Sequence, residues 1–146
     1  MPERTVFESV SRRGAVTLPP TASVWEAARV MTAANCGSVL IVDTLGSMSG
    51  IVTERDLVIR VLSRALDPQA TRVSEVMTRD PYTVLPDMKV SDALLIMMDR
   101  GLQNIPIVTR SSKILGVFSE RDALPPEVGD AISMAEFADQ VNDALA

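Results

Sequence analysis

A short stretch that combines a hydroxyl side chain, a guanidinium and a carboxylate occurs twice in the chain. Residues 50–56 read Gly-Ile-Val-Thr-Glu-Arg-Asp, and residues 116–122, 66 positions later, read Gly-Val-Phe-Ser-Glu-Arg-Asp. A hydroxyl and a guanidinium at a helix start suit phosphate oxygens, and a carboxylate accepts hydrogen bonds from both hydroxyls of a ribose. The residue types together predict a nucleotide site at each copy. The side chains concerned are Thr53, Arg55 and Asp56 in the first copy and Ser119, Arg121 and Asp122 in the second.

The same spacing has a second explanation that needs no ligand. A Thr or Ser followed three positions later by Asp is a common helix start, since the hydroxyl accepts a backbone N–H and the acid favours the positive end of the helix dipole. Arg55 and Arg121 fit this explanation less well, because a cation in the first helical turn is unfavourable unless an anion lies nearby. Helix capping and nucleotide binding are therefore both open hypotheses for the motif.

The two motifs belong to a longer internal duplication. Residues 5–57 align with residues 71–123 without a gap and share 14 of 53 positions, where composition alone would give about three. Each copy predicts the order β-α-β-β-α, in which the last helix begins at the motif. The expected strands are 16–18, 38–43 and 49–53 in the first copy and 82–85, 104–109 and 114–119 in the second, with helices at about 24–35, 54–65 and 89–100.

The copies differ after the motif. Pro125 and Pro126 follow the second motif closely, so its helix is expected to last barely one turn. A separate helix is then expected to begin at Ser133, with an apolar face that must pack on the rest of the module or on a partner. That face comprises Met134, Phe137, Ala138, Val141 and Leu145. The expected division of the chain is a first repeat at 1–66, a second at 67–126 and a helical tail at 127–146.

Composition excludes several classes of function. The chain has no histidine and one cysteine, Cys36, which excludes histidine-based catalysis, an internal disulfide and a cysteine or imidazole zinc site. A formal charge of −5 with 3% aromatic residues argues against binding to nucleic acid or to an anionic membrane. No apolar run approaches the roughly 20 residues of a membrane span, so we expect a soluble, cytoplasmic protein. Cys36 is expected to be a small core residue.

Three arginines precede the first strands of the two copies. They are Arg12, Arg13 and Arg79, and the last two are matched by the duplication. They are in a position to reach a phosphate, or they lie in a solvated turn.

With these motifs the chain resembles a known family, the tandem cystathionine-β-synthase (CBS) domain pair, also called the Bateman module. The resemblance covers about residues 5–125, and it also rests on Thr-x-x-Pro at 17–20 and 83–86 and on Asn-Ile-Pro-Ile-Val at 104–108. It implies an α/β (α+β) fold in which two β-α-β-β-α repeats form a pseudo-twofold disc with two packed three-stranded sheets. It also implies a homodimer. Independently, the apolar run at 93–98 is wider than one helix face, which predicts that this helix is buried on two sides. We expect one side to pack on its own core and the other on another subunit.

The resemblance further implies a ligand and the residues that hold it. CBS pairs bind adenosine-containing ligands such as AMP, ADP, ATP, NAD or S-adenosylmethionine in clefts between the repeats. By this likeness Asp56 and Asp122 hold the ribose, Thr53 and Ser119 the ribose or first phosphate, Arg55 and Arg121 the phosphates, and the backbone at Ser38, Val39, Asn104 and Ile105 the adenine. Because the copies differ at these last positions, the two sites need not bind the same ligand.

These observations predict a stand-alone, non-catalytic regulatory protein that senses an adenine nucleotide (AMP or ATP) or NAD and signals to an effector protein of unknown identity. The alternative is a dimerisation or protein-interaction module whose motifs are only helix caps. An enzyme is the weakest of the three hypotheses, because no pair of acids outside the motifs is placed suggestively.

Overall fold

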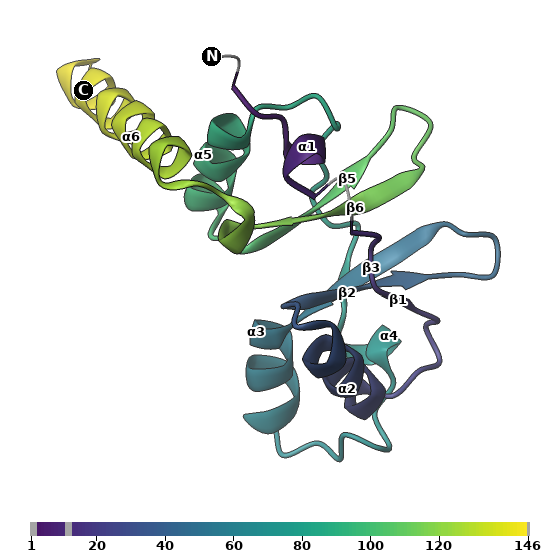
Figure 1. The fold of residues 1–146 in the computed structure, drawn as a ribbon. Helices are drawn as coiled ribbons and strands as arrows, with labels where there is room; N and C mark the ends of the chain where they lie inside the picture. The colour runs from purple at the N-terminus through teal and green to yellow at the C-terminus, as the bar shows by residue number, and fades with distance from the viewer. Residues whose placement is uncertain (1–2, 11–12, 146) are drawn as a thin grey trace.

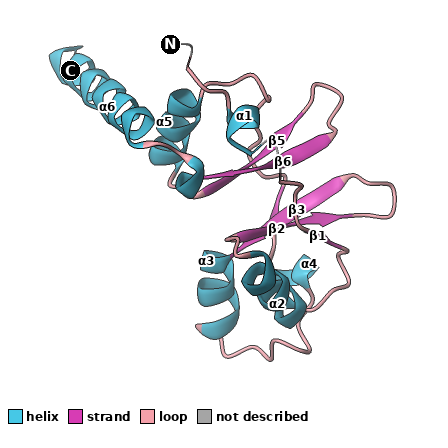
Figure 2. Cartoon of the chain, viewed as in Figure 1, coloured by secondary structure: helices cyan, strands magenta, loops and turns pink. Residues whose placement is uncertain are grey.

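The chain forms two halves whose sheets face each other and whose helices lie on the outside, as the colours of Figure 2 show. The structure is a computed structural model, and it describes residues 3–10 and 13–145. The elements in chain order are α1 (Val6–Val10), β1 (Thr17–Leu18), α2 (Val24–Ala34), β2 (Ser38–Val42), β3 (Met48–Thr53), α3 (Glu54–Leu57), the π-helix η1 (Val58–Leu62), α4 (Val73–Val76), β4 (Thr78–Arg79), α5 (Val90–Arg100), β5 (Asn104–Val108), β6 (Ile114–Ser119), the 3-10 turn η2 (Glu120–Asp122) and α6 (Pro125–Leu145). The predicted mixed fold of helices and strands in two repeats, with a C-terminal helix, is confirmed.

The two sheets are unequal, so the expectation of two three-stranded sheets is wrong. The first has the order β1-β2-β3-β4, with β1 parallel to β2 and the other neighbours antiparallel, whereas the second is the antiparallel pair β5 and β6. Val84 adds an isolated parallel bridge to Ile107, which matches the Leu18–Ile41 pair of the first sheet after a shift of 66 residues. The strand predicted at 82–85 is thus reduced to one bridge, because a proline without an N–H donor stands on either side of it.

The strands at the centre of the molecule are buried on both faces. Successive side chains of a strand point to opposite sides, yet Val39, Leu40 and Ile41 of β2 are all fully buried. Val39 and Ile41 pack into the core beneath α2, so Leu40 is covered from the side of the other half. This double cover explains why β2 is a continuous apolar run without alternation.

The two hydrophobic cores exchange short helices. The first core surrounds α2 and β2 but also contains Val73 and Val76 of α4, which belongs to the second copy of the duplication. The second core surrounds α5 and β5 and contains Val6 and Val10 of α1, from the first copy. In Figure 1, α1 accordingly lies beside β5 and β6, while α4 lies with α2. Each half therefore completes its core with a segment of the other copy.

The helix starts predicted at about residue 24 and at the first motif are confirmed. The Ser23 hydroxyl accepts a hydrogen bond from the N–H of Glu26 at 3.1 Å and caps α2. The first motif is followed by α3 and η1, a continuous helical segment that ends at Leu62. At the second motif the helical turn η2 has only three residues, in agreement with the single turn predicted from Pro125 and Pro126.

The predicted start of the C-terminal helix at Ser133 is wrong. One continuous helix, α6, runs from Pro125 to Leu145, because a proline in the first turn needs no hydrogen bond from its missing N–H and favours a helical φ. The C-terminal half does not pack on the rest of the module, so only the expected packing on a partner remains as a prediction for it. Phe137 is 68% exposed and Leu145 is 81% exposed, and this half extends away from the body in Figure 1.

The N-terminal half of α6 packs on α5. Ala131 is 1% exposed and belongs to the second core, next to Leu94 and Met97 of α5. The second cover that the wide apolar run of α5 requires is thus supplied within the chain, while Met98 at 46% exposure stays open to solvent. The homodimer predicted on this helix remains a prediction.

No helix in the described part of the chain combines the length and the apolar composition needed to cross a lipid bilayer. The longest, α6, carries five acidic residues between Glu127 and Asp143 and no basic one.

Candidate functional site

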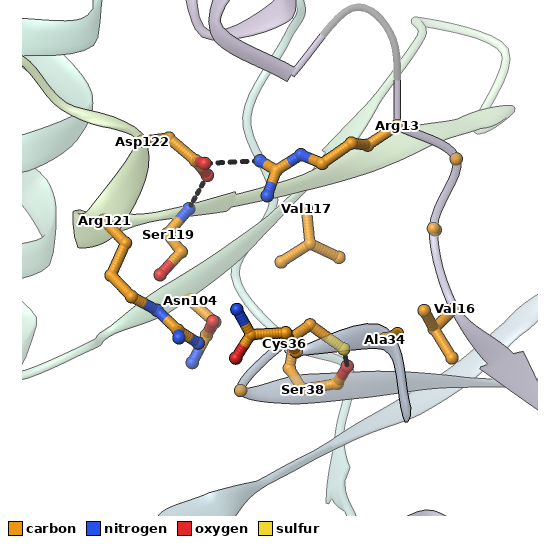
Figure 3. Close-up of a pocket in the computed structure, with 14 residues that line it drawn as sticks. Arg13, Val16, Ala34, Cys36, Ser38, Asn104, Val117, Ser119, Arg121 and Asp122 are labelled. Atoms are coloured by element: carbon orange, nitrogen blue, oxygen red, sulfur yellow. Dashed lines mark hydrogen bonds and ion pairs between the residues drawn. The ribbon is translucent and has the colours of Figure 1, made fainter. Parts of the chain in front are cut away.

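A cavity of about 500 Å³ lies between the two halves and is called here the large cavity. Ser119, Arg121 and Asp122 of the second motif line one side, and residues 13–16 and 34–38 of the first copy line the other. Figure 3 shows these side chains converging from the two halves. The second motif therefore shares its site mainly with residues of the first copy.

A second cavity of about 200 Å³, the small cavity, has the reciprocal composition. Thr53, Arg55 and Asp56 of the first motif face Pro81, Tyr82 and residues 101–104 of the second copy. These residues match those of the large cavity after a shift of 66 positions, so the pseudo-twofold relation between the halves generates both sites.

The large cavity is more open because smaller residues line it. Val16 and Gly37 stand where the small cavity has Tyr82 and Gln103. The ring of Tyr82 is held in place by the guanidinium of Arg100, which lies 4.1 Å from the ring centroid as a cation–π contact. The residue that matches Arg100 in the first copy is an alanine, so the corresponding region of the large cavity is unobstructed.

Each motif aspartate is anchored in the same way by one carboxylate oxygen. The N–H of Ser119 donates to Asp122 Oδ2 at 2.8 Å, and the N–H of Thr53 donates to Asp56 Oδ2 at 2.9 Å. The hydroxyl of Thr53 also accepts from the N–H of Asp56 at 3.2 Å, which completes a capping box. The capping explanation of the motif is therefore correct for the first copy, and in both copies the bond to the main chain uses only one of the two carboxylate oxygens.

That second oxygen has a different partner in each cavity. Asp122 Oδ1 forms an ion pair with Arg13, which reaches across the large cavity from the first copy (Figure 3). Asp56 Oδ1 lies 3.8 Å from Nε of Arg60, one turn further along the same helical segment. The position that matches Arg60 is Pro126, so the second motif has no such cation within its own helix.

Arg121 reaches from the second half towards the first. Its Nη2 atom lies 3.4 Å from the place where a Cβ on Gly37 would stand, and the carboxylate carbon of Glu54 lies 3.6 Å from the same place. A side chain at residue 37 would thus compete with the Arg121 guanidinium for space. In Figure 3 this guanidinium points towards Asn104.

The structure brings together most, though not all, of the predicted site residues. Ser38 lines the large cavity, Arg55 the small one and Asn104 both. Val39 and Ile105 are fully buried in the two cores, and among the described residues neither appears in the lining of either cavity. Their predicted contact with adenine through the backbone remains untested.

The large cavity also contains Cys36, which was expected in the core, and one of the three arginines that precede the first strands. Cys36 lines the large cavity, donates from Sγ to the carbonyl oxygen of Ser38 at 3.4 Å and is only half-buried, although it also packs against the first core. Of the arginines before the first strands, Arg13 lines the large cavity, Arg79 is exposed in β4 and lines neither cavity within the described chain, and Arg12 lies outside the described residues.

The large cavity carries more positive than negative charge. Its charged lining residues in the described chain are Arg13, Arg121 and Asp122. The described part of the chain holds no group of three or more acidic, cysteine or histidine side chains that would bind a metal ion. The arrangement is therefore suited to a ligand with anionic groups and hydrogen-bonding hydroxyls, without a metal ligand set of its own.

Both halves of the duplication match the same known domain family. The sequence profile of the CBS domain matches residues 7–63 and 73–125. The chain belongs to the CBS domain family. This CBS-domain protein is 37% identical over 118 residues to the uncharacterized protein MK0525 of Methanopyrus kandleri, a match that covers 81% of this chain and 60% of the relative. It therefore spans less than two thirds of that relative's length.

Solved structures of CBS-domain proteins share the fold. The CBS domain protein PAE2072 of Pyrobaculum aerophilum, complexed with AMP, aligns with a TM-score of 0.78 at 22% identity and covers 89% of this chain and 99% of its own. The CBS domain pair of protein MJ0100, in complex with 5′-methylthioadenosine and S-adenosyl-L-methionine, aligns with a TM-score of 0.74 at 24% identity, over 83% and 93% of the two chains. At these identities the likeness is one of fold.

Proposed function

We propose that this CBS-domain protein is a non-catalytic regulatory module that binds an adenosine-containing ligand in the large cavity. The observation that carries the proposal is the convergence of Ser119, Arg121 and Asp122 with the open segment at residues 13–16 in a space of about 500 Å³. That volume falls within the about 300–1,000 Å³ of small-molecule sites. Both related structures described above hold adenosine compounds, which supports this ligand class.

The chemistry of the lining suits the parts of a nucleotide. The side chain of Asp122 is 9% exposed and fixed by the N–H of Ser119, so its other oxygen, which pairs with Arg13, is held in place to accept hydrogen bonds from ribose hydroxyls. Arg13 and Arg121 supply guanidinium groups for phosphate oxygens. Val16 and Val117 offer apolar surface for a purine.

The small cavity is proposed to stay empty of nucleotide. Its volume of about 200 Å³ is below the usual range for such sites, and Tyr82 with its Arg100 partner fills the region that is open in the other half. One ligand per chain is therefore expected, in the cavity that contains the second motif.

The proposal is tested by isothermal titration calorimetry of the purified chain with AMP, ATP, NAD and S-adenosylmethionine. We expect binding of at least one of these ligands with one site per chain, and we expect Asp122→Ala to abolish it. The matched variant Asp56→Ala serves as the control, because it changes the small cavity and should leave the affinity unaltered. Absence of binding at millimolar ligand to a folded protein, or equal loss in both variants, contradicts the proposal.

A second candidate function is a protein-interaction module. It is favoured by the exposed apolar side chains of α6, among them Phe137, Val141 and Leu145, and by the capping box that already satisfies the first motif. A ligand that binds only the folded state must raise the melting temperature with its concentration. A melting temperature unaffected by every adenosine compound would favour the interaction module, for which a homodimer and a separate effector protein are the proposed partners.

A further inference from the structure

Both carboxylate oxygens of Asp122 have a partner within the chain. The N–H of Ser119 occupies Oδ2, and Arg13 forms an ion pair with Oδ1, the oxygen that faces the large cavity. A ribose that binds to Oδ1 must displace this guanidinium or share the oxygen with it. The ion pair between Arg13 and Asp122 is therefore a competitor of the ribose for the same atom.

The two partners of this ion pair differ in freedom to move. Asp122 is 9% exposed and fixed by the main chain of Ser119, whereas the side chain of Arg13 is 56% exposed. A long, half-solvated arginine changes its rotamer at little energetic expense, while a buried and hydrogen-bonded carboxylate does not. Arg13 is accordingly the partner that is displaced when a ligand enters.

Displacement of Arg13 changes the charge that the ligand experiences. With Asp122 taken by the ribose, the guanidiniums of Arg13 and Arg121 are both left facing the cavity, and no other carboxylate belongs to its lining in the described chain. A ligand that carries a 5′-phosphate supplies the anion that Arg13 loses. A neutral nucleoside supplies none, and a sulfonium adds a further positive charge.

We infer that Arg13 makes the large cavity selective for 5′-phosphorylated adenosine over neutral and cationic adenosine compounds. The inference rests on the proposed function and specifies its ligand class. When such a ligand binds, Arg13 leaves Asp122 and pairs with the phosphate, and the ribose hydroxyls donate to the Asp122 carboxylate in its stead. A phosphate-free ligand must break the ion pair without replacing it.

In the small cavity the cation beside the motif aspartate cannot move to a ligand phosphate. The cation at Asp56 is Arg60, whose Nη1 also donates to the carbonyl oxygens of Val76 at 2.8 Å and Met77 at 3.2 Å. Arg60 is therefore held by the protein and is not available to follow a ligand phosphate. Arg79, which matches Arg13, lies exposed in β4.

The test is a calorimetric titration with AMP, adenosine, 5′-methylthioadenosine and S-adenosylmethionine at one fixed ionic strength. For the unmodified protein we expect AMP to bind about tenfold or more tightly than the three phosphate-free ligands. For Arg13→Ala we expect opposite changes: AMP weakens by about tenfold, because its phosphate loses a partner, while adenosine binds several-fold more tightly, because Asp122 is free. Arg13→Lys should fall between these two, and Arg79→Ala should match the unmodified protein.

Each outcome decides between the two proposals. Equal affinity for AMP and adenosine in the unmodified protein, or an equal loss for both ligands in Arg13→Ala, overturns the role of Arg13 while the nucleotide site stands. Failure of these four compounds, and of ATP and NAD, to bind overturns the proposed function together with this inference. The comparison of AMP with adenosine needs no variant, so it decides the question even if Arg13→Ala does not fold.

Discussion

The guanidinium of Arg4 holds the carboxylate of Glu127, 123 residues away along the chain, by two hydrogen bonds. Arg4 Nε donates to Glu127 Oε2 at 3.1 Å and Nη2 donates to Oε1 at 2.8 Å. The same Nη2 also donates to the carbonyl oxygen of Asp122 at 2.9 Å. The amino-terminal segment is thereby attached both to the first turn of α6 and to the backbone of the second motif.

This contact predicts a loss of stability in acid. The hydrogen bond from Arg4 holds the pKa of Glu127 below its ordinary value of 4.5. Because the pKa of the folded state is the lower one, the stabilisation is fully present above about pH 4.5 and disappears as the pH falls through the lower, folded value. Arg4→Ala should reduce the free energy of unfolding by about 1–2 kcal/mol at pH 7 and by much less at pH 3.

Urea denaturation at the two pH values measures this difference. Glu127→Gln removes the charge while retaining the shape of the side chain, and it should show the same pH dependence as Arg4→Ala. A loss of stability that is equal at pH 7 and pH 3 in both variants would show that the charges of this pair do not stabilise the fold.

The two motif glycines should differ in their tolerance of a methyl group. A Cβ on Gly50 would stand 2.6 Å from the carbonyl oxygen of Thr78 and 2.7 Å from Sδ of Met77, whereas a Cβ on Gly116 would meet Val10 Cγ2 at 3.3 Å. Gly50→Ala is therefore expected to destabilise the fold by about 1–3 kcal/mol, and Gly116→Ala by less than about 1 kcal/mol. Thermal denaturation of both variants checks the order, and an equal effect would contradict it.

An exchange between matched positions should close the large cavity. A side chain at residue 37 would begin 3.4 Å from Arg121 Nη2, and the backbone of Gly37 does not need the left-handed conformation that requires glycine. Gly37→Gln, which copies the residue of the small cavity, should weaken nucleotide binding by at least about tenfold with little change in stability. Calorimetry measures the affinity. Gln103→Gly, the reverse exchange, should leave it unchanged, and a Gly37→Gln protein that binds as before would contradict the assignment of the cavity.

The exposed end of α6 should contribute little to the stability of a single chain. Its side chains beyond Ala135 are exposed, including Phe137 and Leu145. A chain that ends after residue 135 is expected to keep its free energy of unfolding within about 1 kcal/mol, because the removed residues bury little apolar area. Denaturation at low protein concentration tests this. A loss of several kcal/mol would mean that the exposed face is covered in solution.

The repeat explains why so much of the fold is predictable from the sequence. Shared apolar positions such as Val24 and Val90, or Ile41 and Ile107, indicate equivalent helices and strands, and both members of each pair are buried as expected. The start of α6 was not predictable from the same rules. Pro125 and Pro126 are breakers inside a helix but acceptable in its first turn, and only the packing of Ala131 on α5 decides between the two cases.

The site was predictable in its motif and not in its walls. The spacing of Thr53 and Asp56 identifies them as candidate site residues. The motif alone does not show that each copy faces residues of the other repeat across a cavity. The difference between the cavities depends on Tyr82 and Gln103, which lie outside any motif. Comparison of these two residues with their matched counterparts is the signal that would have identified the smaller cavity in the sequence.

The exchange of α1 and α4 between the cores has a consequence for the whole chain. A single copy carries a core that lacks one helix and a helix that fits the core of its neighbour, so two identical half-chains could complete each other only as a symmetric dimer. Symmetry would oblige such a dimer to have two identical pockets. Covalent fusion removes that obligation, because either copy can then change alone. The joined chain, unlike a symmetric dimer of identical half-chains, can therefore carry two pockets that differ in size and lining.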